Sequence, residues 1–395
     1  MKKRSVTTTI ALMLLAATVS FSVTLTVCSQ NFNQKLGDLE ELINEYEKVA
    51  EVQSAIDRYY VNEFDRAQVT EGAAVGMVAY LGDRWSYYLN PEQYKAFQNG
   101  LNNQMVGIGI NVIEDLETGG ILVVNVHKNS PAEEGGLRVR DVITQVDGKP
   151  VVELGYESAV NAVRGEEGTA VTLTFLTDGV EKTTVFNRRM LEIQAVSSQI
   201  LDGNIGYVKI ENFDLNVDQA FITAVGDLQK ASVSAIIFDV RDNPGGSLPT
   251  LMNMLDHLLP ECLMFRQVDK AGNAEEYKSD ARSLELPMAV LVNENSISAA
   301  EFFAASLQEH GKATVVGMPT TGKSCSQMPI ELSDGSAIVL SVNKYYTSKG
   351  VDLASAGGIK PDVQVELTVE EIRGNYLKPL TEDRQVQAAL EQVKQ

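Results

Sequence analysis

The sequence is poor in the residues that build most metal and redox sites. Its 395 residues include three histidines, His127, His257 and His310, and three cysteines, Cys28, Cys262 and Cys325. The cysteines are too few and too scattered for a disulfide framework or a C-x-x-C metal site. No histidine belongs to an H-E-x-x-H motif. We therefore expect no metal site, and the sequence calls for no cofactor.

Positive charge is also scarce. The chain has 33 Lys and Arg residues against 53 Asp and Glu residues, which gives a formal net charge of −20. Nucleic-acid binding needs clustered Lys and Arg to neutralise phosphates, and such clusters are not evident, so we expect no nucleic-acid partner. The length suggests two or three domains, because one hydrophobic core rarely extends over so many residues.

Charged residues are absent from residue 5 to residue 34, directly after the basic residues 2–4. This uncharged run exceeds the roughly 20 residues that cross a bilayer, whereas a signal peptide has an apolar core of about 7 to 15. An uncleaved anchor with its membrane contact over residues 5–28 is therefore favoured. Lipoprotein cleavage before Cys28 is disfavoured, because bulky Val27 stands where a small residue is needed.

The basic cluster also predicts an orientation. By the positive-inside rule the N-terminus stays in the cytoplasm. We expect a single-pass protein of the cell membrane whose chain after about residue 30 is extracytoplasmic.

Residues 31–103 are expected to be helical. Apolar residues recur at three- and four-residue steps, as in Leu42, Tyr46, Val49 and Val52, which is typical of an amphipathic helix. Such a stripe has to pack against something. Two interpretations remain open: the helix forms a homodimer, or it packs on the protein's own core. The aromatic run "RWSYY" that follows is more typical of a core than of a ligand site.

From residue 104 to residue 190 the hydrophobic period changes to two, with short strand-like runs between Gly, Asn and Asp turns. The segment "GIGI" (Gly107, Ile108, Gly109, Ile110) is followed by "SPAEEGGLRVRDVI" and "VDGKPV". This block resembles a PDZ domain of the type found in bacterial extracytoplasmic proteases. The resemblance implies that the GIGI loop binds a chain-terminal carboxylate through backbone N–H groups, while the peptide adds as a strand to the sheet edge.

From residue 191 to residue 368 apolar strands such as "SAIIFDV" and "MAVLVN" alternate with helices, as in an α/β layer structure. Residues 369–395 resemble a charged helical tail with a solvated face. The expected fold class is α/β and multidomain. Its parts are a cytoplasmic tip and anchor (1–30), an N-terminal helical region (31–103), a PDZ-like β-rich domain (104–190), an α/β core (191–368) and the tail (369–395).

The core contains the pattern G-x-x-x-x-G-K-S from Gly317 to Ser324, the written form of a phosphate-binding loop. A genuine phosphate loop follows a strand and opens a helix whose N-terminal amides hold the phosphates. The strand "ATVVG" is present, but the residues after Lys323 predict a hairpin, because Pro329 and a Ser-Asp-Gly turn precede a β-branched run. Nucleotide binding is therefore disfavoured.

If Lys323 does not bind a phosphate, its remaining chemical role is that of a general base. Burial can lower the pKa of a lysine by several units from about 10.4 and free its lone pair. A candidate nucleophile, Ser298, lies 25 residues earlier, where a strand ends and a helix begins. With Glu301 it also forms the S-x-x-E pattern of a capping box. Both interpretations are compatible, since the positive end of a helix suits an oxyanion.

The combination of motifs points to a family. "SISAAE", the "GK" lysine, Gln327 four residues later, an upstream "RDNPGG" and the PDZ-like block resemble the carboxyl-terminal processing peptidases, also called tail-specific proteases. The resemblance covers about Val49 to Val365 and makes residues 191–368 a serine-protease core. Thr321 stands where an aromatic residue is common and Ser324 where glycine is common, which affects the shape of the loop.

The resemblance also implies roles for particular residues. Ser298 falls on the nucleophile, Lys323 on the general base and Gln327 on the amide that orients the lysine. The oxyanion donors fall on the backbone of Ala299 and of Gly245 or Gly246. Because four residues of a strand span about 13 Å, a contact between Lys323 and Gln327 requires a bend or bulge.

The implied function is that of a membrane-anchored extracytoplasmic serine endopeptidase. It would recognise proteins or peptides by free, apolar C-termini and cleave them near or from those tails. The alternative is a PDZ adaptor or chaperone at the membrane surface with a latent protease core, although a binding module has no use for both Ser298 and Lys323. A Ser-His-Asp hydrolase is disfavoured, because His310 lies about three turns along the helix that Ser298 begins.

Overall fold

The computed structural model of the chain describes the backbone of residues 6–394. Side chains are described throughout residues 44–394 and at scattered positions before residue 44. The chain divides into two compact units, the first ending at Gly72 and the second beginning at Ala73.

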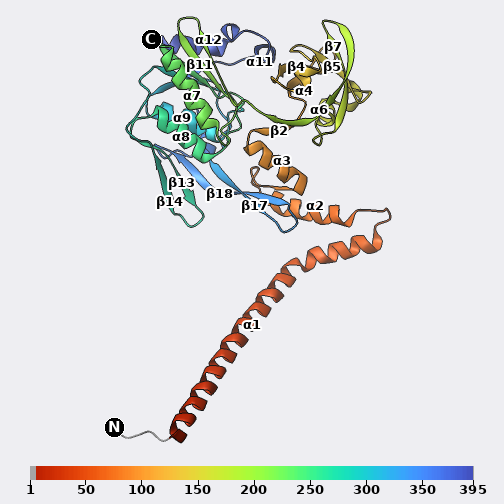
Figure 1. Ribbon diagram of the computed structural model, residues 1–395, viewed down its shortest axis with the longest axis vertical. Helices are drawn as coiled ribbons and strands as arrows, with labels where there is room; N and C mark the ends of the chain where they lie inside the picture. Colours follow the sequence, from red (N-terminus) through yellow and green to blue (C-terminus); the bar gives the residue numbers. More distant parts are fainter. Residues whose placement is uncertain (1–5, 395) are drawn as a thin grey trace. The chain divides into compact units, whose positions relative to one another are not determined.

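The first unit consists mainly of one long helix, α1 (Val6–Tyr59) (Figure 1). Much of the predicted anchor, residues 5–28, lies outside the residues whose side chains are described. Within the described part of the chain, no helix combines the length and the apolar character that crossing a membrane requires. Farther along α1, Tyr46, Val49 and Val52 are exposed by 39%, 47% and 55%. These three residues of the predicted apolar stripe are therefore open to solvent.

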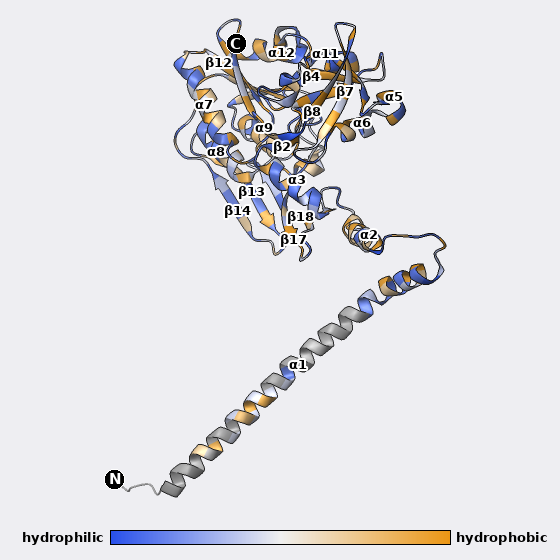
Figure 2. Cartoon of the chain, turned by 45° about the vertical axis from the view of Figure 1, so that its right-hand side comes forward, coloured by the Kyte–Doolittle hydropathy of each residue, from blue (hydrophilic) through white to orange (hydrophobic). Residues whose placement is uncertain are grey.

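The second unit begins within α2 (Arg66–Ala79) and continues through β1 (Tyr87–Leu89) and α3 (Pro91–Leu101). Helix α3 starts with a capping box, in which the side chains of Asn90 and Gln93 each accept a hydrogen bond from the other's backbone N–H. Figure 2 shows hydrophobic residues on α2, where Val75 and Met77 are exposed by 46% and 55%.

A β-rich domain follows. The antiparallel ribbon of β2 (Gln104–Gly107) and β9 (Arg189–Glu192) joins it to the rest of the unit (Figure 1). The elements between them are β3 (Ile110–Glu114), β4 (Ile121–Val126), α4 (Pro131–Glu134), β5 (Val142–Val146), β6 (Lys149–Pro150), α5 (Val151–Leu154), α6 (Tyr156–Val163), β7 (Ala170–Thr177) and β8 (Val180–Asn187). The strand order is β3-β4-β5-β7-β8, with β6 paired to β5, so β3 is an edge strand.

The largest hydrophobic core lies against one face of a six-stranded sheet with the order β10-β11-β12-β15-β16-β19. Its strands are β10 (Val196–Leu201), β11 (Ile205–Ile210), β12 (Ala235–Asp239), β15 (Met288–Val292), β16 (Ala313–Gly317) and β19 (Val363–Gln364). Strand β10 is antiparallel to β11, and the other neighbours are parallel. The parallel strands β12 and β15 are buried along their whole length, as their apolar runs predict.

Helices cover both faces of this sheet. Side chains of α7 (Val217–Lys230), α8 (Leu248–Leu258) and α9 (Ala299–Glu309) share one core with Phe238 and Val290. Because successive side chains of a strand point to opposite faces, Ile237 and Leu291 belong to a second core on the other face. Phe303 of α9 is fully buried and contacts three other aromatic rings of the first core.

The second core gives the C-terminal tail a structural role. Val386 and Ala389 of α12 (Arg384–Val393) are fully buried in it. The tail was expected to have a solvated face, and its other face completes the α/β layers. The remaining elements of this region are α10 (Leu353–Ala356), α11 (Val369–Asn375) and the 3-10 helix η1 (Leu380–Glu382).

A separate five-stranded sheet contains the predicted hairpin. Strands β17 (Cys325–Glu331) and β18 (Ala337–Thr347) pair directly after Lys323, so the hairpin prediction is confirmed. Strand β18 also pairs with β1 and with β13 (Leu263–Asp269), and β13 pairs with β14 (Ala274–Lys278). A Cβ at Gly317 would lie 2.0 Å from the carbonyl oxygen of Val292. The first glycine of the phosphate-loop pattern thus permits close packing of two strands.

Candidate active site

Ser298 lies at the junction between strand β15 and helix α9, as predicted. Its backbone has φ 56° and ψ −115°, which is uncommon for a residue with a Cβ. Such a conformation costs of the order of 1–3 kcal/mol and persists only where its surroundings hold it. Here the carboxylate of Glu301 accepts a hydrogen bond of 2.8 Å from the N–H of Ser298. That bond is the carboxylate half of the predicted capping box.

Glu301 binds more than the helix start. Its carboxylate also accepts hydrogen bonds from the N–H groups of Gly322 and Lys323, at 2.6 and 2.8 Å, and from the Thr320 hydroxyl at 2.6 Å. Glu301 is fully buried, and burial raises its pKa although these four donors favour the ionised form. The backbone nitrogens of Ser298 and Lys323 bond to the same oxygen, so they are at most two hydrogen-bond lengths apart.

The Lys323 side chain is buried and only 9% of the residue is exposed. Its Nζ donates a hydrogen bond to Oε1 of Gln327, so the structure brings these two predicted residues together. The strand register shifts between Ser326 and Gln327, which is the bulge that the spacing required. Among the described residues, no hydrogen bond joins Lys323 Nζ to the Ser298 side chain.

Trp85 is a member of this site that the sequence did not predict. Lys323 Nζ lies 4.7 Å from the centroid of its ring, within the range of a cation–π interaction. The side-chain amide of Gln327 donates to the carbonyl oxygen of Trp85. The aromatic run "RWSYY" was expected to belong to a hydrophobic core. The charged residues Asp83 and Arg84 directly before Trp85 are the sequence feature that argues against a purely apolar environment.

The surroundings of Lys323 lower the pKa of its amine. Burial is the main cause, because the charged form loses hydration. The negative charges of Asp83 and Glu301 favour the ammonium ion, but they do not cancel the effect of burial. The amine is therefore easier to deprotonate than a lysine in water.

The loop that carries Lys323 is held on its other side by Asp352. The buried hydroxyl of Ser324 donates a hydrogen bond to the Asp352 carboxylate, which also caps α10. A Cβ at Gly322 would lie 2.9 Å from the backbone nitrogen of Gly358. Ser324 stands where the resembled family commonly has glycine, and here its hydroxyl anchors the loop.

The predicted oxyanion segment lies directly against the serine. Gly245 has φ 97°, and a Cβ there would lie 2.9 Å from Cβ of Ser298 and 3.0 Å from the nitrogen of Ala299. The N–H of Gly245 donates to the side chain of Asn243 at 2.8 Å, whereas no hydrogen bond of the Gly246 N–H is found among the described residues. Of the two glycines, Gly246 is therefore the one with a free donor.

A buried ion-pair network lies beside this segment. Arg241 forms ion pairs of 2.6 Å with Asp239, at the end of β12, and with Asp383, which caps α12. Burial opposes ionisation of Asp239, but Arg241 and Lys209 outweigh it and hold the pKa of the carboxyl well below its usual range. The tail helix is thus tied to the strand that leads into the oxyanion segment.

The network adjoins a cleft of about 530 Å³. Its lining includes Asp239 and Arg241 from the core, Asn125 from the PDZ-like domain and Tyr376 directly after α11. Ser298, Lys323 and Gln327 are not among its lining residues.

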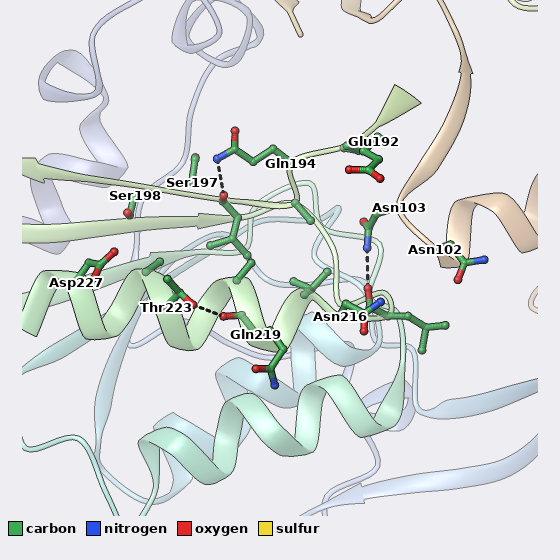
Figure 3. Close-up of a pocket in the computed structure, with 17 residues that line it drawn as sticks. Asn102, Asn103, Glu192, Gln194, Ser197, Ser198, Asn216, Gln219, Thr223 and Asp227 are labelled. Carbon is green, nitrogen blue, oxygen red and sulfur yellow. Dashed lines mark hydrogen bonds between the residues drawn. The ribbon is translucent and has the colours of Figure 1, made fainter. Parts of the chain in front are cut away.

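A larger cleft of about 770 Å³ lies where the ribbon of β2 and β9 meets the core (Figure 3). At its edge the Asn103 side chain donates to the carbonyl of Leu215 at 3.1 Å and accepts from Asn212 at 2.8 Å. Phe213, between them, pairs with Gly245 and Ser247 through hydrogen bonds of 2.7 and 2.8 Å. The ribbon that connects the PDZ-like domain is therefore hydrogen-bonded to the loop that supports the oxyanion segment.

The GIGI segment lies at the start of edge strand β3. Ile108 is buried and its carbonyl accepts from the N–H of Ala132 at 2.9 Å, while the Gly109 carbonyl accepts from His127 at 3.0 Å. Gly109 has φ 83°, and a Cβ there would lie 2.4 Å from Ser130. Gly107 pairs with Arg189 in the ribbon and Ile110 opens β3. The four residues thus form a tight loop next to an unpaired strand edge.

Two other reactive side chains have structural partners. A ring nitrogen of His310 lies 2.8 Å from the carbonyl oxygen of Leu263, which gives this residue a role in packing. Burial raises the pKa of the Cys325 thiol, whose sulfur contacts the Ser341 hydroxyl at 3.3 Å. A raised pKa disfavours the reactive thiolate.

Comparison with known proteins agrees with this arrangement. Residues 204–365 match Peptidase family S41, residues 122–177 match the PDZ domain family, and residues 12–93 match the N-terminal domain of the activating protease CtpB. The carboxy-terminal processing protease CtpA of Bacillus subtilis is 32% identical over 361 residues, which cover 90% of this chain and 76% of CtpA.

Two further proteins similar to this chain are also described as proteases. A probable CtpA-like serine protease of Staphylococcus epidermidis is 32% identical over 84% of this chain and 68% of its own length. The solved structure of a photosystem II D1 C-terminal processing protease has a TM-score of 0.51 and 27% identity, covering 80% of this chain and 92% of that one.

The chain therefore belongs to peptidase family S41, a family of serine peptidases. Within that family it is a C-terminal processing protease with a PDZ domain.

The substitution Glu301→Gln tests whether this carboxylate holds the turn of Ser298 and the loop of Lys323 together. Glu301→Gln keeps the size of the side chain but turns an NH₂ group toward backbone donors, which leaves at least one of them unpaired. We expect a melting temperature several degrees lower and substrate cleavage reduced about 10- to 100-fold, since each lost bond to a charged group costs about 1–3 kcal/mol. Thermal unfolding and cleavage of a disordered protein measure both effects.

The matched control is Glu294→Gln, an exposed glutamate in the loop just before Ser298. It should change neither property. Unchanged turnover of Glu301→Gln would contradict a role of this carboxylate in aligning the site.

Proposed function

We propose that Ser298 is the nucleophile and Lys323 the general base of this protease. One observation carries the proposal: a single buried carboxylate, that of Glu301, binds the backbone of both residues. The lowered pKa of the Lys323 amine supports its role, because a base has to be neutral before it accepts a proton.

In the proposed reaction the Ser298 hydroxyl oxygen attacks the peptide carbonyl carbon while its proton passes to Lys323 Nζ. The ammonium ion then gives this proton to the departing amine as the C–N bond breaks, which leaves an ester on Ser298. Water, deprotonated by Lys323, hydrolyses the ester and restores the serine. The N–H groups of Ala299 and Gly246 are the proposed donors to the oxyanion, with Gly245 shaping the turn.

Gln327 and Trp85 hold the amine before reaction. The hydrogen bond to Gln327 and the ring of Trp85 fix the position of Nζ in a site where it is largely shielded from water. Because Nζ makes no hydrogen bond to Ser298 in this arrangement, catalysis requires a movement of the lysine side chain toward the serine.

Substrates are proposed to be proteins with a free, apolar C-terminal residue. The terminal carboxylate would bind the N–H groups of Gly107–Ile110, and the tail would pair with β3 as a further strand opposite α6. We call this region, Gly107–Ile110 with β3 and α6, the tail site. Among the described residues, β3 has a neighbouring strand on one side only, which supports the proposal. The cleaved protein has to be flexible near its end to reach Ser298.

The sequence of residues 1–30 supports a proposed location at the cell membrane. Lys2, Lys3 and Arg4 would remain in the cytoplasm, residues 5–28 would contact the bilayer and the protease would be extracytoplasmic. The exposed apolar residues of α1, which include Tyr46, Val49 and Val52, are the proposed contact of a homodimer.

Replacement of either reacting group should abolish cleavage. We expect Ser298→Ala and Lys323→Ala each to reduce the turnover of a disordered protein with an apolar C-terminus by at least about 10³-fold, as for other paired nucleophiles and bases. Lys323→Arg should be equally inactive, because arginine stays protonated. Fragments are measured by mass spectrometry, with unchanged thermal unfolding as the control. Undiminished cleavage by any of the three variants would contradict the dyad.

The rate should depend on pH through Lys323. Since the neutral amine is the base, kcat/KM should rise with pH through the pKa of Lys323, with a midpoint below the usual 10.5. Gln327→Ala removes an acceptor that favours the ammonium form, so the midpoint should move to lower pH. The profile is measured between about pH 6 and pH 10. A midpoint at or above 10.5 would contradict a buried lysine base.

Removal of residues 1–30 tests the anchor. We expect the full chain to stay with the membrane fraction after alkaline carbonate extraction, and the truncated protein to appear in the aqueous fraction with unchanged peptide cleavage. Light scattering of the truncated protein reports whether the remaining part of α1, up to Tyr59, supports a homodimer without residues 1–30. An aqueous full-length chain, with residues 1–30 still present by mass spectrometry, would rule out the anchor.

A further inference from the structure

The two ends of the tail site differ in charge. The loop of Gly107–Ile110 lies at the start of β3, whereas Glu114 ends this strand. Helix α6 begins at Tyr156 and ends at Val163. Hydrogen bonds at both ends of α6 define how this helix runs along β3, and its direction decides which charged residues lie at each end of the tail site.

The C-terminal end of α6 lies near the GIGI loop. Carbonyl oxygens of Ala162 and Val163 accept hydrogen bonds of 2.8 and 2.9 Å from Arg188. The next residue, Arg189, pairs with Gly107 across the ribbon. The last turn of α6 and the loop that would bind a carboxylate therefore share one end of the tail site.

This end contains a buried positive charge. Arg188 is only 6% exposed, and its guanidinium donates to the carbonyl oxygens of Ala162, Val163 and Ala170 and to the Thr169 hydroxyl. All four acceptors are uncharged, and within residues 44–394 no carboxylate forms an ion pair with it. A buried cation without a counter-ion attracts an anion over a longer range than an exposed one.

The opposite end of the tail site carries two exposed glutamates, Glu114 at the end of β3 and Glu157 in the first turn of α6. The Tyr156 hydroxyl donates a hydrogen bond of 3.2 Å to the carbonyl of Val112 in the middle of β3. Burial raises the pKa of Tyr156, and the charges of Glu157 and Glu114 raise it further. Arg164 and Arg373 act in the opposite sense, with smaller effects than the two glutamates. Both glutamates are exposed and free to contact a bound peptide.

The register of a bound tail follows from strand geometry. A peptide with its carboxylate at Gly107–Ile110 runs antiparallel to β3, so each residue toward its N-terminus advances by about 3.4 Å along the strand. Val112 and Glu114 lie two and four residues beyond Ile110. They therefore face about the third and the fifth residue from the end of the peptide.

We propose that the tail site selects C-terminal tails that carry a basic side chain at the third to fifth residue from an apolar end. This inference deepens the proposed function and rests on the capture of tails by the PDZ domain. The terminal carboxylate binds at the Arg188 end, while the basic side chain lies between Glu114 and Glu157. An acidic side chain at the same place is repelled.

The test uses ten-residue peptides that share an apolar C-terminal residue and carry Lys, Ala or Glu at the third and fifth positions from the end. Binding to the full chain with Ser298→Ala, which prevents cleavage, is measured by fluorescence anisotropy. We expect the Lys peptide to bind about five- to tenfold more tightly than the Glu peptide at low salt, because exposed charge pairs contribute modestly. The ratio should shrink at high salt.

Matched variants separate the preference from tail capture itself. The double exchange Glu114→Gln with Glu157→Gln should remove the preference, so that the Lys and Glu peptides bind alike. Glu181→Gln, an exposed glutamate on β8 at the opposite sheet edge, should leave the preference intact. Equal affinity for the Lys and Glu peptides, or a preference that survives the double exchange, would overturn the inference while tail capture stands.

Amidation of the C-terminus tests tail capture separately. A peptide with a blocked carboxylate should lose most of its affinity. If amidated and free peptides bind alike, the tail site is not a carboxylate site and both proposals fail. If no peptide binds, capture of isolated tails and the charge preference are overturned together, while the Ser298 and Lys323 variants still report on the catalytic groups.

Discussion

The buried carboxylate of Glu301 is the constraint on which the site depends. It accepts hydrogen bonds from the turn of Ser298 and from the loop of Thr320, Gly322 and Lys323. Burying a carboxylate is costly unless several donors bind it, and here four donors offset that cost. Because both segments bind one carboxylate, neither can shift alone. The same contact holds Ser298 in a backbone conformation that an isolated chain rarely adopts.

Several elements of the second unit meet at the edge of the core sheet where the Glu301 carboxylate lies. The parallel strands β12, β15 and β16 end there, as ligand-binding edges of α/β sheets do. Arg241 ties α12 to the end of β12. Asn103 ties the PDZ ribbon to the loop beside Gly245. The sheet edge that carries Ser298 and Lys323 is thus connected by hydrogen bonds and ion pairs to both the tail helix and the PDZ-like domain.

Much of this was predictable from local patterns. The hairpin after Lys323 was predicted from Pro329 and the Ser-Asp-Gly turn, and it is what separates this loop from a phosphate loop. The bend or bulge before Gln327 was predicted from the length of four strand residues together with the contact between Lys323 and Gln327 that the family resemblance implies. Local patterns could not indicate that α12 completes a hydrophobic core, because the apolar face of this helix is buried only by its contact with the sheet. The same patterns assigned Trp85 to a hydrophobic core, and they did not indicate that the side chain of Asn243 binds the N–H of Gly245.

The sequence by itself determined the types of the elements, the order of the motifs and the membership in peptidase family S41. Those properties depend on neighbours a few residues apart, whose periodicity, capping and turn preferences act within one helix or hairpin. Only the tertiary structure decided that Trp85 would meet Gln327, 242 residues away, or that Asn243 would occupy the N–H of Gly245 and leave that of Gly246 free. Contacts over such separations depend on how whole sheets pack, and no local pattern records that packing.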